Sequence, residues 1–445
     1  MASNTLDPGA PRLGWFIDGN PETDHTAVML QDTGSTIELS IPLKGAFQPK
    51  GPYDRWWSDG VHYGDDPDRK RFSYKPPRII AFNDEKGSVV LIGCRPAGYS
   101  QNPTAGRGRI IANYAILGAK HLRYASVNGI RTNIPAIAKW TQFSSLETTR
   151  TVDDTNRLQS ITATLTTSDP IQLSRRLNLK LRTSWTATEK ERQFTAQELV
   201  EIETRVSRPR SWDKHLDIHG ALLELVSIAS WTPAGIKDVH VLHNEDPLRS
   251  MAGSVIDERW LPVATYRLPR HSETTSPLRF LFPYDEVGPT GINRWLRIRE
   301  VYRGTFGPLY SILRSEVNWS TANLVQSGIA LESLGYRIET IRNEGKRFNN
   351  RNQLSFRTCL EIILEDMRVK PLNDTEDWIK RSRDAYISAK HPSTSKPDIL
   401  EQLNVLRENI LILRFWLGLK LGVKPKTILE LLEFDPLSSP LVMAT

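Results

Sequence analysis

The chain has 445 residues, too many for one compact core, so two or three domains are expected. Its 39% hydrophobic and 24% charged residues are typical of a soluble globular protein. The first residues lack a basic stretch followed by an apolar one, so no secretory signal is predicted. The most apolar stretch, Asn409–Val423, contains Arg414 and Lys420 and is too short to span a bilayer. We therefore expect a cytoplasmic protein without membrane contact.

The charge distribution indicates what kind of partner the chain could bind, and the cysteines indicate the redox state of its compartment. From Gly291 to the end there are 23 Lys and Arg against 18 Asp and Glu, whereas the preceding residues carry 35 against 33. A basic C-terminal third is compatible with a polyanionic partner such as RNA. Cys94 and Cys359 have no CxxC or Cys/His spacing around them. Neither a disulfide framework nor a zinc ribbon is predicted, and a reducing compartment fits.

The first two thirds of the chain contain strand-like runs, and Thr36–Pro42 and Thr183–Arg205 alternate apolar and polar residues as half-buried strands do. Arg78–Cys94 contains two such runs separated by NDEKG, which predicts a hairpin. One helix is predicted over Trp212–Ser230, where apolar residues recur at a spacing near 3.6. The connection Pro49–Asp68 is expected to form no regular element. Further strands are predicted at Thr36–Pro42, Arg109–Leu117, Asp153–Ser168, Thr183–Arg205, Val239–His243 and Ala264–Leu268.

Prolines and glycines in Ser272–Thr290 mark the expected domain boundary, after which the pattern is helical. Short connections between these helices favour an antiparallel bundle. The fold class is therefore α+β: a β-rich, sandwich- or barrel-like domain with one helix over 13–272, a linker over 273–290 and an all-α bundle over 291–445. The predicted helices are Ile292–Tyr302, Leu309–Val317, Thr321–Arg342, Asn352–Arg368, Asp374–Ser388, Pro397–Gly418 and Thr427–Phe434.

Common catalytic and metal-binding signatures are missing from the sequence. It contains no phosphate-binding loop, dinucleotide-binding glycine motif, HExxH or GxSxG. His215 and His219 have metal-ligand spacing on a helix, with Asp213 and Asp217 beside them, but no third ligand is evident. The start of a surface helix is the better interpretation. No cofactor and no metal are expected.

The segment Trp378–Pro392 contains an arginine and a histidine that suit RNA cleavage without a metal. Such cleavage needs a base for the ribose 2′-OH, an acid for the leaving 5′-oxygen and a fixed cation at the phosphate. Histidine titrates in the right range for proton transfer, and arginine offers a planar fork for phosphate oxygens. Arg383 and His391 are therefore the candidate pair. The alternative is a solvated helix end, where basic residues favour the helix dipole.

Arg383 and Asp384 followed by His391 resemble the signature of HEPN ribonucleases. The stretches INRWLRIREVY and NLVQSGIALESLGY and the long apolar helix resemble the ApeA-like HEPN branch. GWFIDG, RIIAFNDEKGSVVLIGC and YASVNGIRTNIPAIAKWT resemble the domain that precedes ApeA-type HEPN domains, so the resemblance spans roughly 13–434. It implies a cytoplasmic anti-phage protein that cleaves RNA as an abortive-infection toxin, with Arg383, Asp384 and His391 as catalytic residues.

The resemblance also implies partners. HEPN nucleases place two copies of the motif in one cleft, so a homodimer through the HEPN domain is expected, with RNA as substrate and a phage-derived trigger at the N-terminal domain. The apolar run Ile410–Leu421 is wide enough to be buried in the bundle and against a partner. Glu332, Arg381 and Lys390 are further cleft candidates. Glu332 is equally explained as a surface or ion-paired carboxylate.

Seven residues separate Arg383 from His391, one more than in the usual HEPN spacing. On an ideal helix the two side chains would lie about 80° apart and about 12 Å apart along the axis. They converge only if the helix ends or bulges between them, or if a partner subunit supplies one. Pro392 favours an ended helix. The longer spacing supports the alternative function, a non-catalytic HEPN-like protein that binds nucleotide, nucleic acid or a protein partner.

Overall fold

The computed structural model describes residues 4–18, 26–46, 53–57, 76–272, 277–317, 319–391 and 397–442. The chain forms two compact units, and neither is continuous in sequence. The first, here the β unit, comprises Met1–Asn133, Glu201–Asp217 and Ile236–His271. The second, here the helical unit, comprises Ile134–Val200, Ile218–Gly235 and Ser272–Thr445. Two segments of the β-rich region thus belong to the helical unit.

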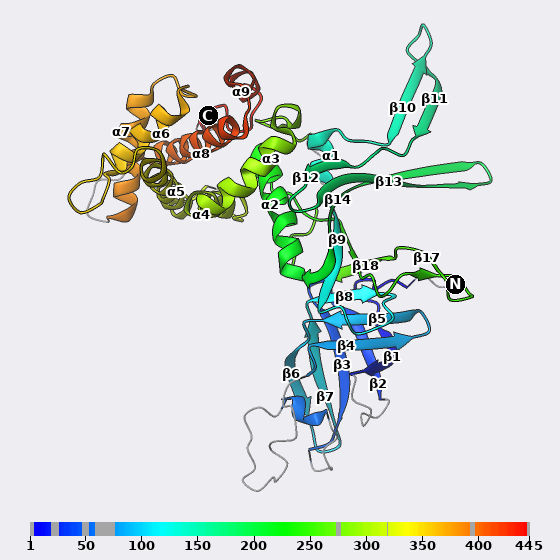
Figure 1. The fold of residues 1–445 in the computed structure, drawn as a ribbon. Coiled ribbons are helices and arrows are strands. Elements are labelled where there is room, and N and C mark those ends of the chain that lie inside the picture. Colours follow the sequence, from blue (N-terminus) through cyan, green and yellow to red (C-terminus); the bar gives the residue numbers. More distant parts are fainter. Residues whose placement is uncertain are drawn as a thin grey trace. The chain divides into compact units, whose positions relative to one another are not determined.

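The β unit is built from antiparallel strands (Figure 1). Its described strands follow one another in the sheet in the order β9-β15-β18-β8-β5-β4-β1-β2-β3-β7-β6, and the second half of β14 (Gln193–Ser211) pairs with β9. The bounds are β1 (Arg12–Ile17), β2 (Ala27–Asp32), β3 (Ile37–Lys44), β4 (Ile79–Asp84), β5 (Gly87–Ile92), β6 (Arg95–Gln101), β7 (Ala105–Ala112), β8 (Tyr114–Leu117), β9 (Ser126–Asn133), β15 (Asp238–Leu242) and β18 (Trp260–Thr265), with β16 (Leu248–Arg249) and β17 (Val255–Asp257) as a separate small pair.

The core of the β unit lies on one face of its sheet. Every second side chain of a strand points to that face. Phe16, Leu39 and Phe82 are at most 1% exposed and share one hydrophobic cluster with Trp56 and Trp57. Both tryptophans belong to the short 3₁₀ helix η1 (Asp54–Trp57), in a segment where no regular element is predicted. The rest of that segment lies outside the described residues, apart from Tyr53.

The predicted hairpin in the β unit is confirmed, because β4 and β5 pair in antiparallel register. The single strand that the alternation predicts over Arg109–Leu117 is wrong. β7 ends at Ala112 and β8 begins at Tyr114, and they pair with different neighbours: β7 with β3 and β6, β8 with β5 and β18. Apolar residues continue on both sides of Asn113, so they do not reveal where one strand ends.

Two hairpins of the helical unit also differ from the predicted strands. Thr183–Arg205 contains the turn between β13 (Leu179–Lys190) and β14, at Glu191 with φ 48°. Asp153–Ser168 contains only β11 (Leu158–Leu165), which pairs with the unpredicted β10 (Leu146–Val152). β12 (Ile171–Ser174) pairs with β13. Nearly all residues of β10 and β11 are exposed, so a burial pattern could not mark them.

The predicted helix Trp212–Ser230 is confirmed as α2, and Thr321–Arg342 as α5. α3 begins at Tyr284, inside the expected linker, because Glu286 in its first turn accepts hydrogen bonds from the Lys424 backbone and the Thr427 hydroxyl. None of the described helices combines the length and apolarity that a membrane crossing requires. The other helices are α1 (Pro135–Thr141), α3 (Tyr284–Val301), α4 (Arg303–Leu313), α6 (Phe356–Met367), α7 (Thr375–Lys390), α8 (Ile399–Leu421) and α9 (Pro425–Leu432).

α8 is the central helix of the helical unit, in contact with α3, α5, α6, α7 and α9. Its residues from Val405 to Gly418 are buried around the whole circumference. The apolar run Ile410–Leu421 is thus covered largely within one chain, which leaves it no broad apolar face for a second copy. A homodimer must use other residues.

Candidate functional site

The position of α7 is fixed by one buried amide. Asn409 of α8 is fully buried, and its Oδ1 accepts from Trp378 Nε1 at 3.1 Å and from Ser382 Oγ at 2.9 Å. Its Nδ2 donates to Ser327 Oγ of α5 at 3.0 Å. A buried polar group that loses its partners costs free energy, so this network sets the register of α7 against α5 and α8. The register decides which residues of α7 face outward.

A glycine on α5 lets α7 approach closely. A Cβ on Gly328 would overlap the ring of Tyr386, so only glycine accommodates the tyrosine at this place. The Tyr386 hydroxyl donates to Glu332 Oε2 at 3.0 Å. Burial and the neighbouring Glu332 raise the pKa of Tyr386, which keeps the phenol protonated as a donor.

Arg383 and Asp384 lie on the outer surface of α7. The Arg383 Nε and Nη2 atoms donate to Asp384 Oδ1 at 3.0 and 2.8 Å, and both side chains are 43% exposed. An exposed ion pair between neighbours adds little stability. A guanidinium has five N–H donors, so this pair leaves others for the oxygens of a phosphate.

His391 lies where α7 ends. The helix stops at Lys390, and His391 is its C-cap residue with φ −119° and ψ 104°. Its backbone N–H donates to the Ile387 carbonyl at 2.9 Å, and the residue is exposed. The expected helix end is confirmed, while Pro392 lies outside the described residues. Within the described ranges, no hydrogen bond or ion pair joins the side chains of Arg383 and His391.

Lys390 and Glu332 come together around Tyr386. Lys390 Nζ lies 4.0 Å from Glu332 Oε2 and 4.0 Å from the centre of the Tyr386 ring. Arg383, Tyr386 and Lys390 follow one another at intervals of three and four residues, so they share one side of the helix. We call Glu332, Arg383, Tyr386 and Lys390 the α7 face. Tyr386 is missing from the sequence-based candidates, although its helical spacing from Arg383 marks it.

Arg381 lies on the opposite side of α7. Its Nε contacts Asp377 Oδ2 at 2.5 Å, and its Nη1 contacts Glu408 Oε2 of α8 at 2.8 Å. Two helical steps turn a side chain by about 200°, which separates Arg381 from Arg383. Arg381 therefore ties α7 to α8 and does not belong to the α7 face.

The helical unit has a cavity elsewhere, of about 510 Å³, between the ends of α5, α6 and α8. Asp366 accepts there from Arg342, from Lys420 at 2.8 Å and from Trp416 Nε1 at 2.8 Å. No sequence-predicted site residue lines this cavity. This cavity is therefore separate from the α7 face.

The expected surface position of His215 and His219 is wrong, since they are 1% and 0% exposed. His215 Nδ1 contacts the Thr204 hydroxyl at 2.8 Å, and its Nε2 contacts the Val127 carbonyl at 3.3 Å. Burial lowers the pKa of His215, which favours the neutral ring. A buried histidine whose two ring nitrogens both have partners is a structural residue of the core. The amphipathic pattern alone could not distinguish such a residue from one at the surface.

Among the described residues, His121, His243 and Glu245 bring possible metal-ligand atoms within 4.8 Å of one another. Nδ1 of each histidine accepts a backbone N–H, from Arg123 at 3.1 Å and from Glu245 at 3.2 Å respectively. An accepting Nδ1 leaves the proton on Nε2, so a neutral ring offers no lone pair to a metal. Arg123 also pairs with Glu245 at 2.7 Å. Nε2 of His121 is buried and has no hydrogen-bond partner among the described residues.

Comparison with known proteins identifies the N-terminal part of the chain. A family model described as ApeA N-terminal domain 1 matches residues 11–295, well over half of the sequence. Neither a curated protein nor a solved structure matches the chain. The matched range contains every described strand and ends within α3, so the helices that carry the α7 face lie beyond it. The chain therefore belongs to the ApeA family, and this membership suggests a role in anti-phage defence.

Proposed function

We propose that this protein is a metal-independent HEPN endoribonuclease that acts as an abortive-infection effector in anti-phage defence. The observation that carries the proposal is the outer end of α7, which presents the Arg383 guanidinium and the exposed His391 on one helix. The excess of basic residues over 291–445 and membership in the ApeA family support it. The substrate is RNA of the host or the phage.

The chemistry assigns a role to each residue. His391 takes the proton from the ribose 2′-OH while that oxygen attacks phosphorus. Arg383 neutralises the charge that develops on the phosphate, and Asp384 orients its guanidinium. Lys390, held between Glu332 and the Tyr386 ring, supplies a second cation. The bond to the 5′-oxygen breaks as an acid protonates it, which leaves a 2′,3′-cyclic phosphate and a 5′-hydroxyl.

The acid for the leaving oxygen is His391 of a second copy. A two-fold axis through the cleft would bring the second His391 there, because an isologous interface contains each residue once from each copy. Ile329, Tyr336 and Ile387 support this arrangement, because they are apolar, 39–42% exposed and lie on the helices that carry the α7 face. Their burial would offset the cost of association.

We place recognition of a phage-derived trigger on the ApeA domain. Val152, Leu158 and Ile161 are apolar residues that are at least 50% exposed on the β10–β11 hairpin. Exposed apolar groups of this kind suit contact with another protein. Replacing all three by serine is expected to leave RNA cleavage by the purified protein unchanged and to abolish protection against phage; retained protection would remove the hairpin from the proposal.

The proposal is tested by sequencing RNA ends after induced expression of the wild-type protein and of His391→Ala. New 2′,3′-cyclic phosphate ends are expected with the wild type and are expected to vanish in the variant. Arg357→Ala on α6 is the control for the loss of an exposed basic side chain outside the proposed site, because Arg357 is 45% exposed and paired with Glu361 and Glu376. Equal cleavage by His391→Ala would leave only the non-catalytic binding function.

Mixing two inactive variants tests the shared cleft. Arg383→Ala and His391→Ala are each expected to be inactive alone. In a mixed dimer the shared cleft keeps one Arg383 and one His391, so the base and one cation are present and only the acid histidine is missing. Mixing the two variants is therefore expected to restore a small part of the activity. A wild-type protein that is monomeric by light scattering yet fully active would contradict the dimer mechanism.

A further inference from the structure

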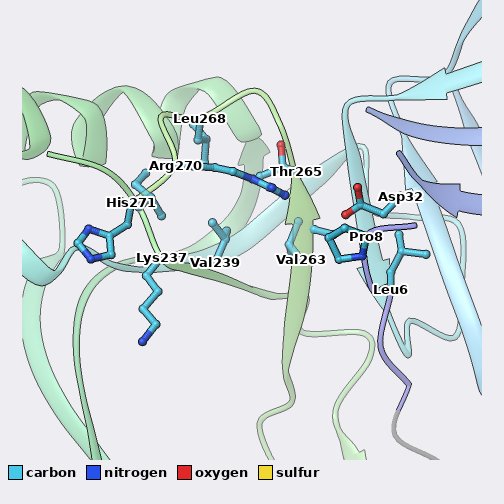
Figure 2. A pocket seen from close by; sticks show the side chains of 12 residues that line it. Leu6, Pro8, Asp32, Lys237, Val239, Val263, Thr265, Leu268, Arg270 and His271 are labelled. Carbon is cyan, nitrogen blue, oxygen red and sulfur yellow. The ribbon is translucent and has the colours of Figure 1, made fainter. Parts of the chain in front are cut away.

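The β unit contains a cavity of about 350 Å³ that the proposed nuclease chemistry does not use (Figure 2). It lies between the N-terminal segment, the end of β2 and the strands β15 and β18 with the residues that follow them. Its volume falls in the range of small-molecule sites. The lining residues are Leu6, Pro8, Asp32, Ile236, Lys237, Val239, Val263, Ala264, Thr265, Leu268, Arg270 and His271.

Arg270, Lys237 and His271 line the cavity from two directions. A parallel bridge joins Ile236 to Arg270, with the His271 N–H donating to the Ile236 carbonyl at 3.1 Å. Because successive side chains of an extended segment alternate, Lys237 and His271 lie on one side and Arg270 points away from them (Figure 2). In the part of the chain that the structure describes, none of these three side chains has a carboxylate partner. The positive charge at the cavity is therefore available to an anion.

Arg270 is held in place by a chain of contacts. Its guanidinium carbon lies 3.7 Å from the centre of the Tyr266 ring, and the Tyr266 hydroxyl donates to Asp32. Asp32 is 2% exposed and also accepts the Gly34 N–H at 2.8 Å. Burial and Asp32 raise the pKa of Tyr266, so its hydroxyl remains a donor. A cation fixed by packing and hydrogen bonds binds an anion with less loss of entropy than a mobile one.

The remaining walls suit an uncharged ring system. Leu6, Ile236, Val239 and Val263 present apolar side chains that are 6–9% exposed. Figure 2 shows Lys237 and His271 on one side, Asp32 with Leu6 and Pro8 on the other, and Arg270 reaching between them. The Asp32 carboxylate has room for a further donor, because its two oxygens accept about four hydrogen bonds.

We propose that this cavity binds a nucleoside monophosphate. Arg270 holds the phosphate, the apolar walls contact the base or sugar, and Asp32 accepts a hydrogen bond from a hydroxyl or amino group. A free inorganic anion would leave the apolar walls in contact with water, and an apolar ligand would leave the cations unpaired. The ligand class that uses all three features is a phosphate linked to a ring system.

Isothermal titration of the full chain with AMP, GMP, CMP and UMP tests this inference. At least one is expected to bind, and Arg270→Ala is expected to weaken binding by about tenfold or more, the effect of losing a charge-assisted hydrogen bond. Arg267→Ala is the matched control, because Arg267 is an exposed arginine on the same segment that does not line the cavity. It should bind like the wild type.

Titrations with adenosine, ribose 5-phosphate and inorganic phosphate test the parts of the ligand separately. Each of these fragments is expected to bind more weakly than the best nucleotide. Inorganic phosphate that binds equally well would overturn the nucleoside part of the inference. No heat with any monophosphate, or an unchanged affinity in Arg270→Ala, would overturn the site. Because binding is measured without RNA cleavage, such failure leaves the proposed nuclease unaffected.

Discussion

Two arginine–aspartate pairs of the helical unit have the same chemistry and opposite surroundings. Arg414 and Asp435 are 0% and 1% exposed, with two contacts of 2.8 Å between them. Arg414 also donates to the carbonyls of Ile228 and Ala229 at the end of α2. Arg383 and Asp384, by contrast, are each 43% exposed and share a single carboxylate oxygen.

The contrast separates a structural pair from one that a ligand can use. Every polar atom around Arg414 is committed to the fold, so removing one partner leaves an unpaired charge in the core. Among the described residues, the hydrogen bonds of the Arg383 side chain go to its sequence neighbour Asp384, and the side chain is 43% exposed. A site for phosphate needs the second kind of arginine.

The largest effect on stability is expected for Arg414→Ala. It should lower the free energy of unfolding by about 3–5 kcal/mol, because Asp435 and two carbonyls of α2 lose their partner. Denaturant unfolding measures this loss. The double variant Arg414→Met with Asp435→Leu is expected to recover part of it, because both charges are then removed. A loss under about 1 kcal/mol in Arg414→Ala would show that the pair is not structural.

A smaller effect on the free energy of unfolding is expected for Gly328→Ala. This substitution displaces α7 but changes neither arginine–aspartate pair. The added methyl group overlaps the Tyr386 ring, so the free energy of unfolding should fall by about 1–3 kcal/mol. Gly307→Ala is the matched control, since nothing lies within 4 Å of a Cβ there. Similar melting curves for the two variants would contradict the close contact of α5 and α7.

The smallest effect on stability is expected for Arg383→Ala, within about 0.5 kcal/mol of the wild type. Arg381→Ala should cost more, because Arg381 links Asp377 to the poorly exposed Glu408. Parallel urea titrations of the two variants measure the difference. If Arg383→Ala were the more destabilising, Arg383 would be a structural residue like Arg414.

Elements with a clear pattern could be predicted from the sequence. α2 and α5 have the predicted bounds because they combine helical spacing with a definite start and end. The hairpin of β4 and β5 was marked by polar turn residues. The break between β7 and β8 is marked by one polar residue, Asn113, and the exposed β10–β11 ribbon has no burial pattern, so both required the structure.

The candidate site was predictable in part, for a physical reason. The end of α7 at Lys390 follows from the proline after His391, a local rule of the chain. The contacts of Tyr386 with Glu332 and Lys390 depend on how α5 packs against α7. Likewise, the sequence cannot separate Arg381 from Arg383 by role, because the difference is set by Glu408, 27 positions after Arg381.

The most direct test is cleavage of a defined RNA by the purified protein in EDTA, with the product ends identified. The wild type is expected to produce 2′,3′-cyclic phosphate ends, while a 2′-deoxy substrate should resist. Arg383→Ala and His391→Ala should lose activity by about 10²–10⁴-fold, the typical contribution of general acid–base catalysis, with melting curves like that of the wild type. Cleavage that requires added magnesium, or that proceeds at the wild-type rate in His391→Ala, would contradict the assignment of Arg383 and His391 as a metal-independent RNA-cleaving pair.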